Sequence, residues 1–181
     1  GLSAYDNTSI ITMNSGEFGT KPIITSVWPE TPNLAIYNEV KTLRIPNDSV
    51  WAFCPPYGLA LYLQGGMPTN RNNYVVRTSI PNPSLVVAKS LHKKLNDWGV
   101  TVDGSYSVQT EYFPEERTLI YEYKSRKLRE IIRLTNFKSN NLYAEHIFRR
   151  LGNLIMPHEA TSSASIQVVK DYWAKQGIDV S

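Results

Sequence analysis

The stretch Tyr74-Val-Val-Arg-Thr-Ser-Ile-Pro-Asn-Pro-Ser-Leu-Val-Val-Ala88 marks a change of pattern along the chain. Up to about residue 80, short runs of β-branched and aromatic residues alternate with turn signals, which is typical of a small sheet or sandwich. At Asn82 the period changes, because asparagine can cap a helix, proline suits its first turn, and apolar residues then recur at helical spacing. The sequence therefore predicts an α+β fold, with a β-rich part over residues 1–80 and an α-rich part over residues 81–181.

The expected elements follow from these patterns. Strands are predicted over residues 9–13, 23–28, 34–40, 49–54, 59–63 and 74–79. A first helix should begin at Asn82, place Leu85, Ala88, Leu91, Leu95 and Trp98 on one face, and end at Gly99. A hairpin is predicted from residues 106–113 and 118–123, followed by helices over about 126–136, 140–151 and 162–176, with Gly152 and Gly177 ending the last two.

Composition restricts the classes of function. The chain has 181 residues, 41% of them hydrophobic and 19% charged, which is enough to bury a core without disulfides. A net charge of +3, from 19 basic and 16 acidic side chains, is too small to indicate nucleic-acid binding by itself. The single cysteine excludes an internal disulfide, and no apolar run approaches the length of a membrane span.

The sequence gives little indication of a metal site or of a reactive thiol. The three histidines, His92, His146 and His158, lack the spacing of zinc ligands and have no partner cysteines. Cys54 lies in the sequence Phe-Cys-Pro-Pro, which favours a packing role over a nucleophile. We therefore expect neither a metal nor another cofactor.

The segment Ser139-Asn-Asn141 has two interpretations. Ser139 can be the N-cap of the helix over 140–151, because its oxygen can accept an unpaired amide proton of the first turn. Alternatively, serine-x-asparagine can be a proton relay plus an amide clamp, which is one of three elements of penicillin-recognising serine enzymes beside S-x-x-K and K-T-G. Here K-[ST]-G does not occur, and S-x-x-K occurs once, as Ser90-Leu-His-Lys93. Because Ser90 falls in the middle of an amphipathic helix, we interpret that match as accidental.

The basic run over residues 124–133 is a further candidate for binding. At helical spacing Leu128, Ile131 and Ile132 point inward and the charges outward, so a solvated helix face is the default interpretation.

The order of several segments along the chain indicates a protein family. The relevant stretches are Ser79-Ile-Pro-Asn-Pro83, Trp98-Gly-Val-Thr-Val-Asp-Gly104, Leu119-Ile-Tyr-Glu-Tyr-Lys-Ser125, Lys138-Ser-Asn-Asn-Leu-Tyr-Ala-Glu145 and Gln176-Gly-Ile-Asp179. This order closely resembles the middle of the class C low-molecular-mass penicillin-binding proteins, the D-alanyl-D-alanine carboxypeptidase/endopeptidase family. The resemblance covers nearly the whole chain and is strongest from about residue 79 to 179.

The resemblance implies a division of roles. Residues 1–80 correspond to a β-rich inserted region with its return strands, and residues 81–181 to part of the catalytic domain. Ser139 would relay a proton to or from the leaving amine, and Asn141 would hold the peptide backbone of the substrate. The implied partners are peptidoglycan stem peptides and β-lactams, and the implied location is periplasmic or otherwise extracytoplasmic.

The nucleophile motif of this family would precede residue 1, and its third motif would follow residue 181. We therefore expect the chain to be a central piece of a longer polypeptide, inactive alone, and to self-associate through faces that normally pack on other segments. A different class of function is a non-catalytic cell-wall-binding or interaction module on the same fold, which would not need Ser139. A nucleic-acid module is disfavoured by the near-balanced charge.

Overall fold

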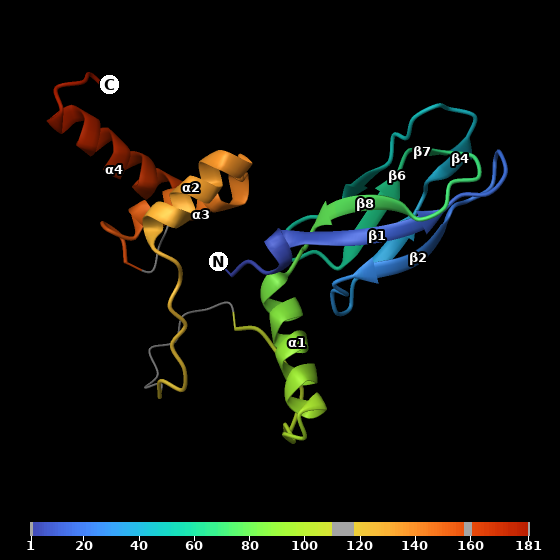
Figure 1. Cartoon of the computed structure of the whole chain (residues 1–181), viewed down its shortest axis with the longest axis horizontal. Coiled ribbons are helices and arrows are strands. Elements are labelled where there is room, and N and C mark those ends of the chain that lie inside the picture. Colours follow the sequence, from blue (N-terminus) through green and yellow to red (C-terminus); the bar gives the residue numbers. More distant parts are fainter. Residues whose placement is uncertain (1, 110–117, 158–160, 181) are drawn as a thin grey trace. The chain divides into compact units, whose positions relative to one another are not determined.

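The computed structural model describes residues 2–109, 118–157 and 161–180. They divide into two compact units, Gly1–Pro114 and Glu115–Ser181 (Figure 1), and each unit is described by itself. The expected boundary near residue 80 separates an inserted region from catalytic-domain material. This boundary stays a prediction.

The first unit contains the strands and one long helix. Its elements are a 3-10 turn (Tyr5–Asn7), β1 (Thr8–Asn14), β2 (Ile23–Trp28), β3 (Ala35–Asn38), β4 (Lys41–Leu43), β5 (Trp51–Phe53), β6 (Ala60–Gln64), β7 (Gly66–Pro68), β8 (Tyr74–Ser79) and α1 (Pro83–Asp97). Each of the six runs predicted as strands contains a strand, and the α+β class is confirmed. The sequence did not indicate β4 and β7, which lie outside the six predicted runs.

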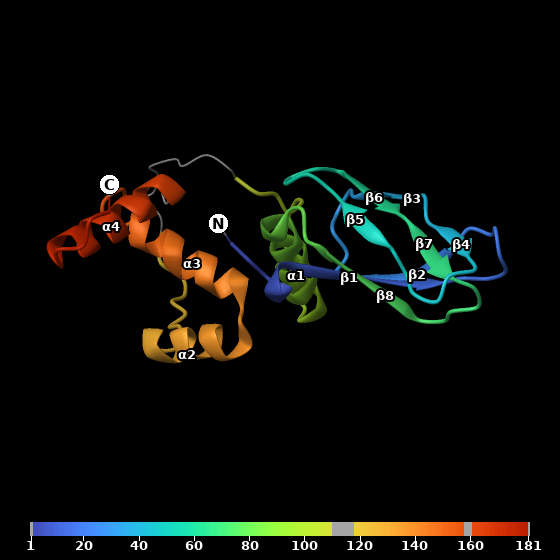
Figure 2. The same ribbon diagram turned by 90° about the horizontal axis from the view of Figure 1, so that it is seen from above.

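Two three-stranded sheets share one hydrophobic core. Their orders are β2-β1-β8 and β3-β6-β5, and β4 and β7 form a separate parallel pair (Figure 2). All pairs in the first sheet are antiparallel, whereas β3 and β6 run parallel. The buried side chains come from both three-stranded sheets, from β7 and from the β3–β4 connection: Ile11, Met13, Val40, Leu61, Leu63, Met67 and Val76. This first unit is therefore a small two-layer sandwich.

The break in the β3 pattern at Asn38 has a local cause. The Asn38 side-chain oxygen accepts a hydrogen bond from the Val40 amide at 3.1 Å, and its side-chain nitrogen donates to the Pro22 carbonyl at 2.7 Å. An asparagine side chain that bonds the backbone two residues on forms a turn in place of a continued strand. The chain therefore turns at Asn38 and enters β4.

Helix α1 begins as predicted, but its burial differs from the prediction. The Asn82 side chain accepts from the Leu85 amide at 3.0 Å, and Pro83 occupies the first turn. The fully buried side chain is Val86, at 1% exposure, whereas Leu91 and Trp98 of the predicted apolar face are 58% and 74% exposed. An apolar helix face is buried only where other elements cover it, and Val86 lies in the first turn of α1, at the end that follows β8.

The predicted hairpin is not present in the described residues. Residues 106–109 and 118–123 have no strand assignment, and the remainder of the hairpin lies outside the part of the chain that the structure describes. Leu119, Ile120 and Tyr121 are 78%, 95% and 78% exposed. A single extended segment leaves its backbone groups unpaired, so a strand-like pattern becomes a strand only beside a partner.

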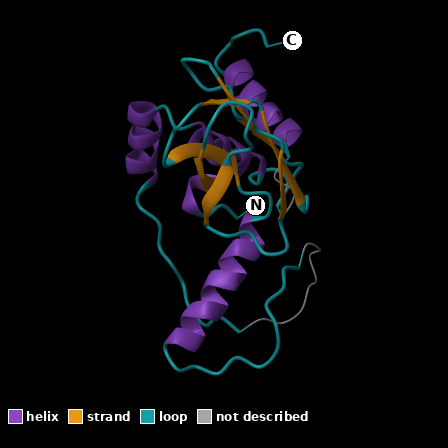
Figure 3. Cartoon of the chain, turned by 90° about the vertical axis from the view of Figure 1, so that its right-hand side faces the viewer, coloured by secondary structure: helices purple, strands orange, loops and turns teal. Residues whose placement is uncertain are grey.

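In the described residues of the second unit, the regular elements are helices (Figure 3). Its helices are α2 (Leu128–Lys138), α3 (Asn141–Gly152) and α4 (Ser162–Lys175), which confirms the three predicted helices. The inward face predicted for α2 is wrong in part, because Leu128 is 60% exposed and the buried residue is Thr135.

Helix α3 ends at Gly152, as predicted, but Gly152 has no positive φ, so it does not end the helix in a left-handed conformation. A side-chain carbon at this position would lie 2.8 Å from the Ser165 hydroxyl oxygen of α4. The glycine therefore allows α3 and α4 to approach each other closely. Gly177, with φ of +80°, does take the left-handed conformation expected after α4.

Two glycines at positive φ give a matched test of the sandwich. A methyl group at Gly65 would lie 2.0 Å from the Ser49 carbonyl oxygen, whereas at Gly19 it would meet nothing within 4 Å. Backbone strain acts at both positions, and overpacking acts only at Gly65. We expect Gly65→Ala to lower the free energy of unfolding by about 2–5 kcal/mol and Gly19→Ala by about 1–2 kcal/mol, measured by urea denaturation. Equal losses in the two variants would contradict this packing.

The Tyr74 hydroxyl predicts an alkaline limit to stability. It donates a hydrogen bond to the Asp48 carboxylate, and desolvation together with this carboxylate raises the pKa of Tyr74 from 10.0 to about 12. Because the folded pKa is the higher one, the stabilisation is complete below pH 10 and is lost as the pH rises from 10 to 12. Urea midpoints measured over this range should fall less steeply for Tyr74→Phe than for the unmodified chain. Parallel curves would show that Tyr74 does not contribute.

Candidate active site

The corner between α2 and α3 is built on Ser139 in a left-handed conformation. Ser139 has φ of 49° and ψ of 44°. Its amide donates to the Asn136 carbonyl at 3.4 Å, and the Asn140 amide donates to the Thr135 carbonyl at 3.0 Å. This pair of bonds is the Schellman arrangement that closes the carboxyl end of a helix. Helix α2 therefore ends at a position where glycine is the usual residue.

The N-cap of α3 is Asn140, so the interpretation of Ser139 as that cap is wrong. The Asn140 side-chain oxygen accepts from the Tyr143 amide at 3.1 Å. Serine and asparagine are similarly good caps, and the sequence places them side by side, so propensity alone could not choose between them. The choice follows from the backbone: Ser139 is already used, in left-handed form, to close α2.

Asn140 thus helps to close α2 through its amide and caps α3 through its side chain. The side chains of its two neighbours are not used in either helix end. Asn141 is the first residue of α3, and the side chains of Ser139 and Asn141 are both exposed. Within the described residues, no hydrogen bond is made by either side chain. The corner therefore presents one hydroxyl and one carboxamide, two residues apart, to the solvent.

The conformation of Ser139 is itself unusual. A residue with a side chain in the left-handed region costs about 1–2 kcal/mol relative to a right-handed one, a cost that glycine avoids. Strained backbone of this kind clusters at functional sites, so an observed outlier motivates a functional hypothesis. The fold of the corner needs a left-handed residue, but it does not need a hydroxyl group.

A positively charged hollow lies along α2 beside this corner. It measures about 540 Å³, and it is lined by Arg126, Glu130, Arg133, Leu134, Phe137 and Lys138. The Lys138 ammonium lies 5.9 Å from the centre of the Phe137 ring. With three cations and one anion in its wall, the hollow favours anionic groups.

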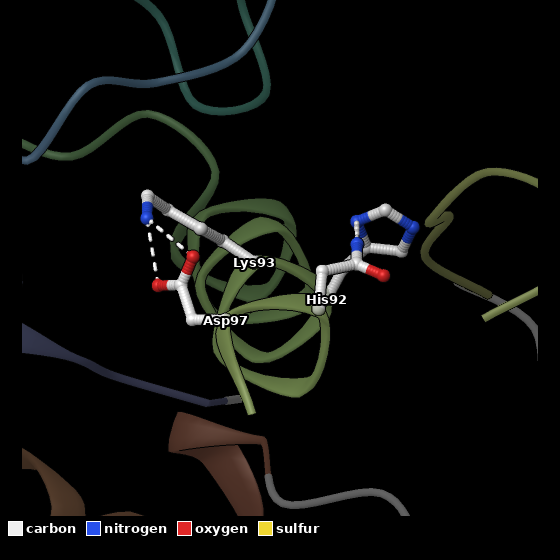
Figure 4. Close-up of polar contacts among 4 residues, drawn as sticks. His92, Lys93 and Asp97 are labelled. Atoms are coloured by element: carbon white, nitrogen blue, oxygen red, sulfur yellow. Dashed lines mark hydrogen bonds and ion pairs between the residues drawn. The ribbon is translucent and has the colours of Figure 1, made fainter. Parts of the chain in front are cut away.

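The S-x-x-K match in α1 has other contacts. The Ser90 hydroxyl lies 3.3 Å from the Tyr5 hydroxyl, and the Lys93 ammonium bonds the two carboxylate oxygens of Asp97 at 2.7 and 3.0 Å (Figure 4). Within the described residues Lys93 makes no hydrogen bond to Ser90. Lys93 is therefore held by an acid and does not act as the base of a serine nucleophile in this geometry.

The remaining candidates are not assembled into a site. His92 bonds Asn96 at 3.2 Å, and His158 lies outside the described residues. In the described ranges, no group of three or more His, Cys, Asp or Glu side chains could hold a metal ion. The Cys54 thiol packs against the sandwich core, and burial raises its pKa, which disfavours the thiolate. Nor is any helix in the described ranges long and apolar enough to cross a membrane.

Solved structures share this fold. Penicillin-binding protein 4 (dacB) from Haemophilus influenzae, in complex with a novel β-lactam, aligns with a TM-score of 0.79 and 16% identity over 98% of this chain and 41% of that one. A second crystal structure of the same protein gives a TM-score of 0.79 and 16% identity, covering 98% of this chain and 39% of the other. The chain thus spans about two fifths of the length of these structures.

A search of curated proteins gives no significant match. A sequence model of a peptidase family, in contrast, matches residues 30–181, which include the whole α2–α3 corner. The match extends over most of the sandwich and all of the helices. The chain therefore belongs to the D-Ala-D-Ala carboxypeptidase 3 (S13) family.

Proposed function

We propose that this chain contributes the second catalytic motif of a serine-type D-Ala-D-Ala carboxypeptidase/endopeptidase that forms an acyl-enzyme with peptidoglycan stem peptides. The nucleophile and the K-T-G motif come from outside residues 1–181. The chain alone is therefore inactive, because a relay group cannot replace the nucleophile that it serves.

The division of roles at the α2–α3 corner supports this proposal. The helix ends are satisfied by the Ser139 and Asn140 amides and by the Asn140 side chain, so the side chains of Ser139 and Asn141 are not needed for capping. Both side chains are exposed, and Ser139 occupies a backbone position better suited to glycine. Family membership adds a second, associational argument, since function depends on a site and not on a fold.

Each exposed group has a role that fits its chemistry. The Ser139 hydroxyl can accept a proton and donate one, so it suits relay to the leaving amine. The Asn141 carboxamide offers both a donor and an acceptor, which matches the N–H and C=O groups of a peptide backbone. The cations along α2 suit the carboxylate that stem peptides and β-lactams have in common.

The proposed substrate sets the location and the partners. Peptidoglycan lies outside the cytoplasm, so the complete protein would act in the periplasm or at another extracytoplasmic site. β-Lactams would bind the complete protein as substrate mimics. Self-association of the chain stays a prediction, and the exposed apolar side chains of the second unit, such as Ile120 and Phe137 at 95% and 81% exposure, are consistent with it.

Intact mass after incubation with benzylpenicillin tests the chain as it stands. We expect no covalent adduct on the folded chain, because Lys93 is bonded to Asp97 and Ser139 has no base among the described side chains. Circular dichroism of the same sample confirms that it is folded. An adduct mapped to Ser90 would make the S-x-x-K match a nucleophile, and one mapped to Ser139 would give that serine a different role.

The roles of Ser139 and Asn141 need the polypeptide that contains all three motifs. There, Ser139→Gly should keep the unfolding free energy or raise it by up to about 1 kcal/mol, because it relieves the left-handed strain. The same change should slow acylation by about 10²–10⁴-fold. Asn141→Ala should slow acylation by about 10²-fold through loss of substrate positioning.

Ser163→Ala, an exposed serine of α4, is the matched control and should leave acylation unchanged. Full acylation by both corner variants would favour the non-catalytic wall-binding module. Such a module would retain purified peptidoglycan equally well with and without the Ser139 hydroxyl.

A further inference from the structure

A hollow lined mainly by polar side chains lies between the β4–β5 connection and the β7–β8 connection of the first unit. It measures about 390 Å³, which is within the usual size range of small-molecule sites, roughly 300–1,000 Å³. We use the name polar hollow for this site, whose polar side chains are those of Asn47, Asp48, Arg71, Asn72, Asn73 and Tyr74.

The β7–β8 connection is fixed by the end of β1. The hydroxyl of Ser15, which is 8% exposed, donates to the Pro68 carbonyl at 2.5 Å and accepts from the Arg71 amide at 2.9 Å. The Asn73 amide donates to the Asn14 side-chain oxygen at 2.8 Å. These bonds use the backbone of Arg71 and Asn73, so the connection is held in place while both side chains remain available to a ligand.

Asp48 is oriented from the opposite wall of the hollow. The Tyr74 hydroxyl donates a hydrogen bond to one of its carboxylate oxygens. Desolvation, followed by this carboxylate, raises the pKa of Tyr74 to about 12, so the phenol keeps its proton and remains a donor at neutral pH. The second Asp48 oxygen has no hydrogen-bond partner among the described residues. A perturbed titratable group in a hollow is a reason to look for a ligand there.

The two charges of the polar hollow do not neutralise each other. Asp48 and Arg71 line the same space, but no ion pair joins them, and neither forms a salt bridge elsewhere in the described ranges. A guanidinium group offers a fork of donors that matches a carboxylate, and a free carboxylate oxygen accepts from an ammonium group. The space between Arg71 and Asp48 therefore suits a molecule that has both groups.

The same two charges select against simpler ligands. An anion attracted by Arg71 is repelled by Asp48, and a cation attracted by Asp48 is repelled by Arg71. A neutral ligand gains from neither charge. The three carboxamides in the wall each offer donors and acceptors, which suits a small ligand with several polar atoms.

We propose that the polar hollow binds a free α-amino acid in its zwitterionic form. The carboxylate of the ligand pairs with Arg71, and its ammonium group pairs with the free oxygen of Asp48. The neighbouring carboxamides of Asn47, Asn72 and Asn73 bond its remaining polar atoms. This site shares no residue with the α2–α3 corner and does not rest on the proposed function.

The test is a titration followed by the backbone amide signals of the chain. Glycine is the probe because it is the smallest α-amino acid, and acetate and methylammonium are the controls because each has one of its two charged groups. We expect saturable shifts for residues 47–48 and 71–75 with glycine. Acetate and methylammonium should each bind at least about tenfold more weakly, since hydrogen bonds between charged partners are the strong ones.

Two variants remove one charge each. Arg71→Gln and Asp48→Asn should both weaken glycine binding about tenfold or more. Asp48→Asn keeps an acceptor for the Tyr74 hydroxyl, and the Arg71 side chain makes no bond in the described ranges, so both variants should fold. Their ligand-free amide spectra check this. Arg77→Gln, which changes an exposed arginine of β8 outside the hollow, is the matched control and should bind normally.

The other outcomes each contradict the proposal. Absence of a saturable shift with glycine would overturn it. Acetate binding as tightly as glycine would reduce the hollow to a simple anion site, and an equal loss in Arg71→Gln and Arg77→Gln would indicate a general effect of charge. Because glycine cannot acylate the chain, failure here leaves the peptidase proposal intact, and failure of the acylation tests leaves this result intact.

Discussion

Packing between β1 and β6 is the constraint on which the sandwich depends. Ile11 and Met13 on one sheet and Leu61 and Leu63 on the other are at most 1% exposed. Full burial of each such side chain contributes about 1.5–3 kcal/mol. Since side chains in a strand alternate between faces, burying Leu61 and Leu63 forces Tyr62 outward. The exposure of Tyr62 is thus a direct consequence of the core.

The corner of the helical unit depends on a few hydrogen bonds. One residue, Asn140, closes α2 through its amide and opens α3 through its side chain. The corner is then held by groups other than the hydroxyl of Ser139 and the carboxamide of Asn141. The side chains of Ser139 and Asn141 are therefore exposed beside a residue that already closes both helix ends.

Local signals predicted much of this structure. The Asn82-Pro83 start of α1 and the strands β1, β2, β3, β5, β6 and β8 were predicted, because capping and alternation act within a few residues. The predictions that were wrong concern features that depend on contacts between residues distant in the sequence. Val86 is buried and Leu91 is not, although both lie on α1, and residues 118–123 around Ile120 are not part of a strand in the described ranges. Gly152 ends α3 as expected, but the sequence did not show that it also makes room for Ser165 of α4.

By itself the sequence determined the fold class, the order of the elements and the S-x-N segment with its family resemblance, because these depend on residue type and spacing along the chain. Only the tertiary structure decided that Asn140, and not Ser139, caps α3, since two adjacent residues with similar capping propensity are distinguished by backbone geometry. It alone also brought Tyr37, Phe53 and Tyr62 into one row, because pairing between strands that are distant in sequence is set by a shared core and leaves no mark in local periodicity.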